Sequence, residues 1–178
     1  MKYSVIILIL FLAGTSYGQK EGFHLTNALV VGQLDKEEDR YAIEVNLTEL
    51  LVDAGIKATP SLNILKLGSD ASLLTTDSLQ KVVASKGIDT YMLVSVRGYD
   101  RKYKVSEKKE DLQTALNAGN LFGIYREEIV SVSFEFTFFR NGQWVYSDIV
   151  KCGNVSDLDS VIKRFRKTVA KRIDKKWK

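Results

Sequence analysis

An alternation of apolar and polar side chains ahead of an Asn-Gly pair constrains the fold of this chain more than any other feature. Apolar residues stand at every second position from Val130 to Phe138, so a strand here has one buried face. Asn141-Gly142 follows, and this pair suits a two-residue type I′ turn because both positions tolerate a positive φ. The sequence therefore predicts a β-hairpin over residues 129–150.

The turn also predicts which residues of the two strands face each other. If the two strands pair without interruption from the turn, Phe139 faces Trp144 and Glu135 faces Asp148. Two neighbouring carboxylates could act as a general acid–base pair, although like charges on a solvated sheet face are the commoner arrangement. The same register places Phe139, Trp144 and Tyr146 on one face, as a candidate aromatic surface unless a helix covers them.

Short apolar runs and amphipathic stretches alternate in the first hundred residues. Strands are predicted at residues 27–33, 56–60 and 88–97, and the first and third of them are apolar enough to be buried. Between them, one helix is predicted from a capping-box-like pattern at Asp35 and Glu38 to Gly55. A second helix buries a stripe of Leu79, Val82 and Val83. This order of elements favours a sheet with parallel neighbours joined by right-handed crossovers.

Residues 100–128 differ from the rest of the chain because they are polar and heavily charged. We predict a charged excursion from the edge of the sheet, mobile unless a partner orders it, with a short helix around Leu112 and Leu116. Residues 19–178 are then a single α/β domain. Its fold is a mixed sheet of about five strands, three with βαβ-type crossovers followed by the antiparallel hairpin, packed against helices.

A long amphipathic helix is predicted from about Ser156 to Trp177. Its apolar stripe should pack on the sheet and consists of Leu158, Val161, Ile162, Phe165, Val169 and Ile173. Basic side chains crowd its other faces. A candidate surface for an anion or a partner is formed by Lys163, Arg164, Lys167, Lys171, Arg172 and Lys175. An ordinary solvated helix face is one interpretation, and contact with lipid headgroups, cell-wall polymer or an acidic protein is the other.

The composition excludes several classes of function. The chain has 26 basic and 22 acidic residues, and this excess of positive charge is too small to imply a nucleic-acid partner. Cys152 is the only cysteine and His24 the only histidine, which excludes an intramolecular disulfide and argues against a structural zinc site. No nucleophile elbow or phosphate-binding loop is present. The sequence therefore predicts no catalytic, cofactor-binding or metal-binding residues.

Residues 1–18 have the pattern of a cleaved export signal. Lys2 gives a positive start, residues 5–13 are apolar without interruption, and Ser16 and Gly18 are the small residues that a signal peptidase reads. The apolar run is shorter than the roughly 20 residues that span a bilayer, and no longer run follows. We expect a protein that is exported from a bacterial cytoplasm, periplasmic or secreted, with no transmembrane segment after the signal is removed.

The first half of the chain resembles a group of exported bacterial α/β domains. The resemblance rests on ALVVGQLDKEEDRYAIEVNLTELLVDAGIKATPS, a helix, and KGIDTYMLVSVRGYD, in which Gly87, Ile88 and Asp89 match the group's Gly-Ile-Asp motif ahead of a strand. The group includes the periplasmic domain of the curli-secretion lipoprotein, the lipoproteins that activate penicillin-binding proteins, and the amino-terminal domain of TolB. The resemblance implies a non-enzymatic envelope module that contacts other proteins. Many members carry a lipid-bearing cysteine after the signal, which this sequence does not have.

The leading hypothesis is thus an exported, non-enzymatic binding or assembly module of the bacterial cell envelope that acts through protein–protein contact. Two alternatives stay open: a small extracytoplasmic hydrolase that uses acidic residues, and a protein that binds anionic surfaces through its basic carboxy-terminal helix.

Overall fold

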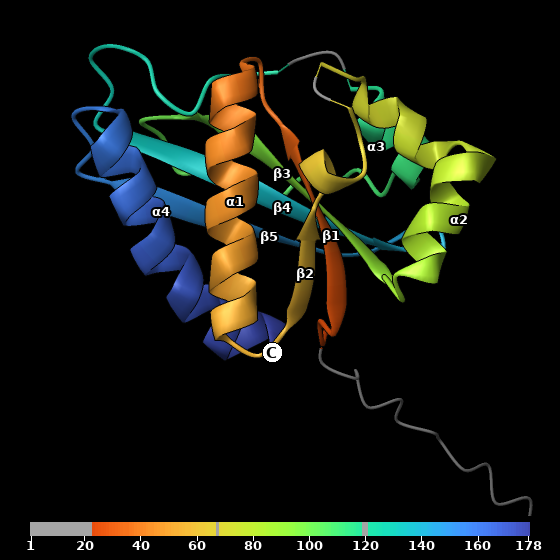
Figure 1. Ribbon diagram of the computed structural model, residues 1–178. Helices are drawn as coiled ribbons and strands as arrows, with labels where there is room; N and C mark the ends of the chain where they lie inside the picture. Colours follow the sequence, from red (N-terminus) through yellow and green to blue (C-terminus); the bar gives the residue numbers. More distant parts are fainter. Residues whose placement is uncertain (1–22, 67, 119–120) are drawn as a thin grey trace, which may run out of the picture.

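The computed structural model describes residues 23–66, 68–118 and 121–178, and the proposed export signal at residues 1–18 lies outside them. Five strands form one sheet in the order β2-β1-β3-β4-β5 (Figure 1). The elements are β1 (Asn27–Gln33), α1 (Glu37–Asp53), β2 (Lys57–Pro60), α2 (Asp77–Ser85), β3 (Thr90–Tyr99), α3 (Leu112–Leu116), β4 (Ser131–Arg140), β5 (Gln143–Gly153) and α4 (Leu158–Arg172). The fold class predicted from the sequence is confirmed.

Helices cover both faces of this sheet. β1 pairs in parallel with β2 and β3, whereas β3, β4 and β5 pair in antiparallel fashion. α1 and α4 lie side by side over one face and enclose the larger core (Figure 1). α2, α3 and the turn Ala71–Thr75 enclose a smaller core on the other face. No helix in the described part of the chain combines the length and the apolar character that crossing a membrane requires.

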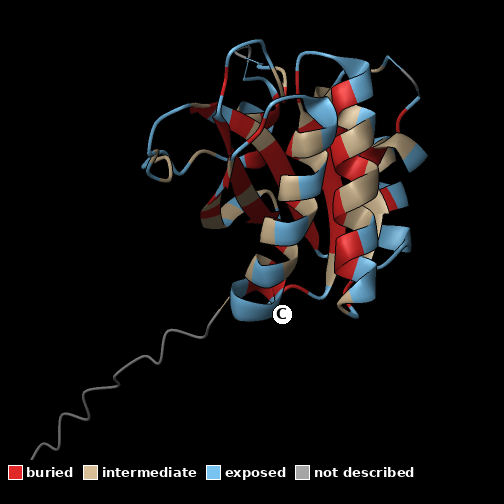
Figure 2. Cartoon of the chain, turned by 90° about the vertical axis from the view of Figure 1, so that its left-hand side faces the viewer, coloured by how far each residue is buried: buried red, intermediate tan, exposed pale blue. Residues whose placement is uncertain are grey.

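Aromatic side chains of β4 form the centre of the larger core. Phe134, Phe136 and Phe138 have no exposed surface. The ring centre of Phe165 on α4 lies 5.0 Å from that of Phe134, and the ring centre of Trp177 lies 4.8 Å from that of Phe136. The sheet behind the helices is almost entirely buried, while the outer surfaces of the helices are exposed (Figure 2). The three phenylalanines therefore lie against α4, on the face that the alternation predicted to be buried. The prediction of a single buried face is wrong, because Ser131, Ser133 and Glu135 on the other face are at most 7% exposed, and Val130, ahead of β4, is 65% exposed.

The predicted carboxy-terminal helix is present, but its last turn is not α-helical. α4 ends at Arg172, and a π-helical turn, Ile173–Trp177, follows it. Trp177 is fully buried, and its carbonyl accepts a hydrogen bond from the Leu25 N–H at 2.8 Å. Leu158, which was predicted to be buried, is 43% exposed because it lies in the first turn of α4, ahead of the residues that reach the core.

Two details of the other helices also differ from the prediction. Lys36 is the N-cap residue of α1 and makes no side-chain cap, so the predicted capping box is absent. Asp39 instead accepts a hydrogen bond from the Ile124 N–H at 3.0 Å, which ties α1 to the loop ahead of β4. On α2, Val83 is buried and Val82 is 39% exposed, because neighbouring residues of a helix point about 100° apart.

The hairpin has the predicted turn but a different register. Asn141 and Gly142 have φ values of 50° and 73°, as a type I′ turn requires. Trp144 faces Phe139, but the next pair joins Phe138 to Tyr146, so the single residue between Trp144 and Tyr146 has no partner on β4. This β-bulge turns every later residue of β5 to the opposite face from the one predicted.

The bulge separates the two carboxylates that the sequence placed together. Glu135 now pairs with Ile149, and Asp148 pairs with Phe136. Because paired residues share a face, Asp148 lies on the larger-core side with Phe136, and Glu135 lies on the other side. The predicted carboxylate pair is therefore wrong.

The charged segment 100–128 is also placed differently from the prediction. It follows β3, which is the central strand of the sheet and not an edge strand. The Ser106 N–H donates to Glu135 Oε1 at 2.5 Å, and the Leu112 N–H donates to the Gly142 carbonyl at 2.9 Å. Leu112 and Leu116 of α3 are buried in the smaller core, which confirms the short helix. The described part of this segment is thus held against the sheet by contacts within the chain.

Candidate functional site

The basic residues of α4 separate into two groups with different roles. Lys163, Lys167 and Lys171 of α4 and Lys175 of the π-helical turn after it are exposed and follow one another at intervals of four residues. We call these four residues the lysine row. None of the ion pairs found within the described residues includes any of them. The lysine row is therefore a line of positive charge that is available to an external partner.

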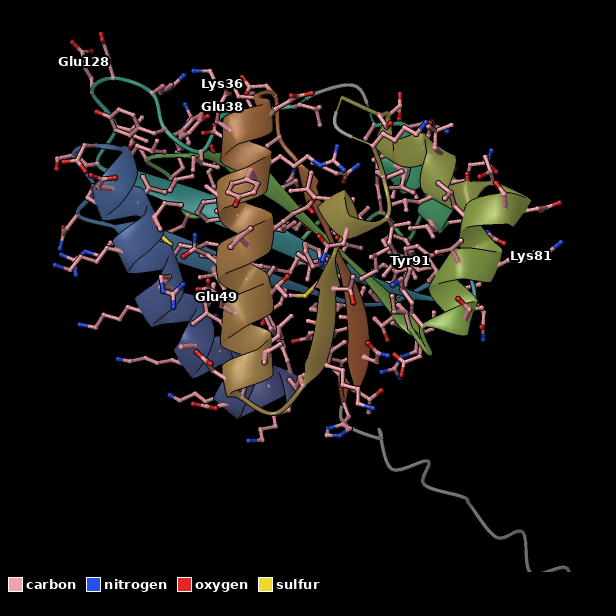
Figure 3. The ribbon with its side chains drawn as sticks, viewed as in Figure 1. Lys36, Glu38, Glu49, Lys81, Tyr91 and Glu128 are labelled. Carbon is pink, nitrogen blue, oxygen red and sulfur yellow. The ribbon has the colours of Figure 1, made fainter. Side chains whose placement is uncertain are left out.

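Two arginines of the same helix are paired with carboxylates of the protein itself. Arg172 Nε lies 3.4 Å from Asp148 Oδ2, and Arg172 Nη2 donates to the Ile149 carbonyl at 3.2 Å. Arg166 pairs with Glu49 of α1 at 2.7 Å, and Figure 3 shows Glu49 on the side of α1 that faces α4. Arg164 is half-buried. Of the six basic residues singled out in the sequence, the structure brings the four lysines together and pairs Arg172 with Asp148.

Two features hold the lysine row in place. Asp157 caps α4 by accepting a hydrogen bond from the Ser160 N–H at 2.7 Å, while Ser160 Oγ accepts from the Asp157 N–H at 3.1 Å. The Ser160 N–H and the Ser156 hydroxyl, which both donate to the Asp157 carboxylate, hold its pKa below the ordinary value of 3.8. On the inner side, Val161, Phe165 and Val169 have no exposed surface. The lysines therefore project from a helix whose start and inner face are both fixed.

The candidate aromatic surface does not exist as one surface. Phe139 is buried in the smaller core. Trp144 is half-buried, donates from Nε1 to Ser147 Oγ at 2.7 Å, and has the Lys109 ammonium 4.7 Å from its ring centre. The β-bulge turns Tyr146 to the opposite face of the sheet, where it packs against the larger core. The sequence missed this because nothing near residue 145 marks the bulge.

The two carboxylates of the hairpin are each neutralised on their own face. Arg97 Nε lies 3.4 Å from Glu135 Oε2. Asp148 faces Arg172 and also accepts hydrogen bonds from Trp177 Nε1 at 3.1 Å and from its neighbour's backbone N–H at 2.9 Å. A carboxylate with three donors around it is an acceptor in a structural network. The pair therefore has no arrangement suited to joint acid–base catalysis.

A buried carboxylate that the sequence did not single out joins β1, α1 and the end of β2. Glu44 has no exposed surface and accepts from the Gly32 N–H at 2.8 Å, from Ser61 Oγ at 2.7 Å and from Arg40 Nε at 3.0 Å. Gly32 lies beyond Pro60, where β2 ends, so its N–H has no strand partner on that side. Glu44 thus gives the Gly32 N–H and the Ser61 hydroxyl an acceptor and pairs with Arg40. The charge of Arg40 is consequently not free for a ligand.

The remaining candidate groups are buried or isolated. Cys152 is 1% exposed, and burial raises the pKa of its thiol to about 12, so it is not a nucleophile at neutral pH. His24 is exposed, and its backbone carbonyl accepts a hydrogen bond from Arg140. No group of three or more His, Cys, Asp or Glu side chains within the described ranges could hold a metal ion.

A groove lies on the side of the sheet away from the lysine row. It measures about 460 Å³ and runs between α2 and the β4–β5 turn. Tyr91 of β3 lies in it, between the sheet and α2 (Figure 3). Burial raises the pKa of the Tyr91 hydroxyl. The sequence analysis did not single out Tyr91, which stands among the apolar residues of a predicted strand. Its hydroxyl, in an otherwise aliphatic run, was the only feature that could have indicated a site.

No family model matches the chain, and no curated protein matches it. Solved structures with a similar course of the backbone include a lipoprotein from Neisseria meningitidis, GNA1162, at 15% identity and a TM-score of 0.45, over 84% of this chain and 98% of that chain. The PelC dodecamer from Paraburkholderia phytofirmans has 16% identity and a TM-score of 0.46, over 85% of this chain and 90% of that chain. Neither bears the name of one of the groups that the sequence resembles, so that resemblance stays a prediction.

Proposed function

We propose that this protein is an exported, non-enzymatic binding module of the bacterial cell envelope and that the lysine row of α4 is its contact surface. One observation carries the proposal. Arg166 and Arg172 of α4 are paired within the protein, whereas Lys163, Lys167, Lys171 and Lys175 are exposed and take part in no ion pair among the described residues.

An acidic protein surface is the partner that fits this row best. Four residues of helix rise by roughly 6 Å, so the four ammonium groups form a line along one helix and not a compact pocket. A helix that binds in the plane of a membrane inserts an apolar face beside its basic residues. The apolar residues Val161, Phe165 and Val169 are buried against the sheet and are not available for insertion.

The hydrolase alternative has less support. It relied on Glu135 and Asp148 acting together, and these residues lie on opposite faces of the sheet, each beside an arginine.

Site-specific photo-crosslinking in the producing cells tests the contact surface. A photoreactive residue in place of Lys171 should give a discrete protein adduct, because it lies within the contact. The same residue in place of Lys81 should give none, because Lys81 is on α2, on the opposite side of the molecule (Figure 3). The adduct should disappear when Lys167 and Lys175 are both changed to glutamate, since charge reversal opposes binding of an acidic surface.

Other results would overturn this proposal. A protein adduct that survives charge reversal, or no protein adduct from position 171, contradicts the contact surface. If the purified protein is retained on anionic vesicles, and this retention depends on the lysine row, then the partner is a lipid surface and not a protein. The export part has its own test: the mature protein should be found outside the cytoplasm and begin at Gln19. An intact leader on cytosolic protein contradicts it.

A further inference from the structure

The groove between α2 and the β4–β5 turn has an apolar floor and a polar rim. Val83, Ile88 and Leu112 are buried side chains that line it. Its volume of about 460 Å³ falls in the range of small-molecule sites, which are typically about 300 to 1,000 Å³. A second hollow beside it shares Gln80, Leu112 and Gly142, so the groove continues towards α3.

Tyr91 is the unexplained group in this groove. It is 9% exposed, yet its hydroxyl makes no hydrogen bond to any described residue. Thr48 Oγ1 is the one completely enclosed side-chain polar atom without a partner in the part of the chain that the structure describes, so the Tyr91 hydroxyl opens into the groove. The hydroxyl is therefore free to form a hydrogen bond with a molecule in the groove.

The charges at the rim are already engaged with each other. Thr90 Oγ1 donates to Asp89 Oδ1 at 2.5 Å and accepts from Arg140 Nε at 2.9 Å. Asp89 also accepts from the Thr26 hydroxyl. One carboxylate and one guanidinium in a shared network leave the groove without a net charge that would select a charged ligand.

The groups that remain are neutral side chains. The Tyr91 hydroxyl and the amides of Gln80 and Asn141 line the groove, and each of them can both donate and accept hydrogen bonds. The neighbouring backbone groups are occupied: the Leu112 N–H donates to the Gly142 carbonyl, and the Ile88 N–H donates to the Val83 carbonyl. An extended peptide, which is recognised through main-chain hydrogen bonds, therefore finds little to bind.

We propose that this groove binds a small uncharged ligand rich in hydroxyl groups, of the size of one or two sugar rings. The apolar floor takes the C–H face of such a ring, while Tyr91, Gln80 and Asn141 bind its hydroxyls. The site lies across the sheet from the lysine row and is independent of the proposed contact surface.

Titration of the isotope-labelled protein with neutral sugars, glucose, galactose, mannose and N-acetylglucosamine among them, tests the site by NMR. At least one sugar should shift the side-chain amide signals of Gln80 and Asn141 in a saturable way. Tyr91→Phe removes only the hydroxyl and should weaken binding by about tenfold or more, because the ligand loses a hydrogen bond in a largely buried place.

Tyr41→Phe is the matched control, since Tyr41 is 62% exposed on α1 and lies outside the groove. It should leave the affinity unchanged, and an unchanged melting temperature shows that each variant is folded. No saturable shift with any neutral sugar overturns the proposal. So does equal binding by the Tyr91→Phe variant, or binding of charged sugars or peptides alone.

Discussion

Replacing Asp148 by asparagine should destabilise the protein, and the direction of this change tests the hairpin register. In the unbroken register Asp148 faces Glu135, and removing one of two like charges would stabilise the protein or leave it unchanged. In the observed register Asp148 is 4% exposed, faces Arg172 at 3.4 Å and accepts a hydrogen bond from Trp177 Nε1 at 3.1 Å. The two registers thus predict opposite signs.

The magnitude follows from what each substitution leaves behind. Asp148→Asn keeps an oxygen for the Trp177 indole and loses the charge beside Arg172, whose side chain is 29% exposed and can be partly solvated. We expect a loss of about 1–2 kcal/mol in the free energy of unfolding. Asp148→Ala also leaves the fully buried indole N–H without an acceptor, which adds about 1–2 kcal/mol.

A double-mutant cycle isolates the indole contribution. In a Trp177→Phe background there is no N–H to satisfy, so Asp148→Ala should be less destabilising by about 1–2 kcal/mol than in the parent protein. Urea unfolding followed by far-ultraviolet circular dichroism measures each free energy without depending on tryptophan fluorescence.

Two outcomes would refute this reasoning. One is an Asp148→Asn protein as stable as the parent or more stable. The other is a cycle with no coupling between positions 148 and 177. Glu135→Gln is the control on the other face: it should also destabilise, because Arg97 loses its partner, and its effect should add to that of Asp148→Asn because the two residues share no partner.

Three further predictions concern the core. The thiol of Cys152 has a folded pKa of about 12, above its ordinary value of 9.0, so it stabilises the fold fully below pH 9 and this contribution is lost as the pH rises towards 12. Between pH 8 and pH 10.5, the free energy of unfolding measured with urea should fall more in the parent protein than in Cys152→Ala. An equal fall in both proteins would contradict the burial of the thiol. Phe165→Ala should lower the free energy of unfolding by about 3–5 kcal/mol, since its ring is fully buried against Phe134; a loss below 1 kcal/mol in the same assay would contradict that packing. Gly32→Ala places a Cβ 3.0 Å from Arg40 Cγ and should destabilise by about 1–3 kcal/mol, which a neutral result in chemical denaturation would disprove.

The order of the elements could be predicted because it depends on local patterns. The apolar face of β4 and the Asn141-Gly142 turn are properties of neighbouring residues, and both are confirmed, whereas the burial of the other face of β4 was not predicted. The apolar stripe of α4 is local in the same sense, and its members Val161, Phe165 and Val169 are buried as predicted.

The candidate sites depended on contacts between distant residues and were predicted less well. The lysine row could be found from its spacing, but Arg172 could not be excluded from it, because its partner Asp148 faces α4 only as a result of the bulge. Tyr91 gave no signal because its groove is formed by α2 and the β4–β5 turn, which are far apart in the sequence.

The sequence by itself determined which segments are strands and helices, because hydrophobic period, turn residues and helix ends act over a few neighbouring residues. Tertiary structure alone decided which face of the sheet each residue of β5 occupies. A single unpaired residue in a strand reverses that choice, and what stabilises the reversed arrangement lies elsewhere in the chain, in the indole of Trp177 and the guanidinium of Arg172 that surround Asp148.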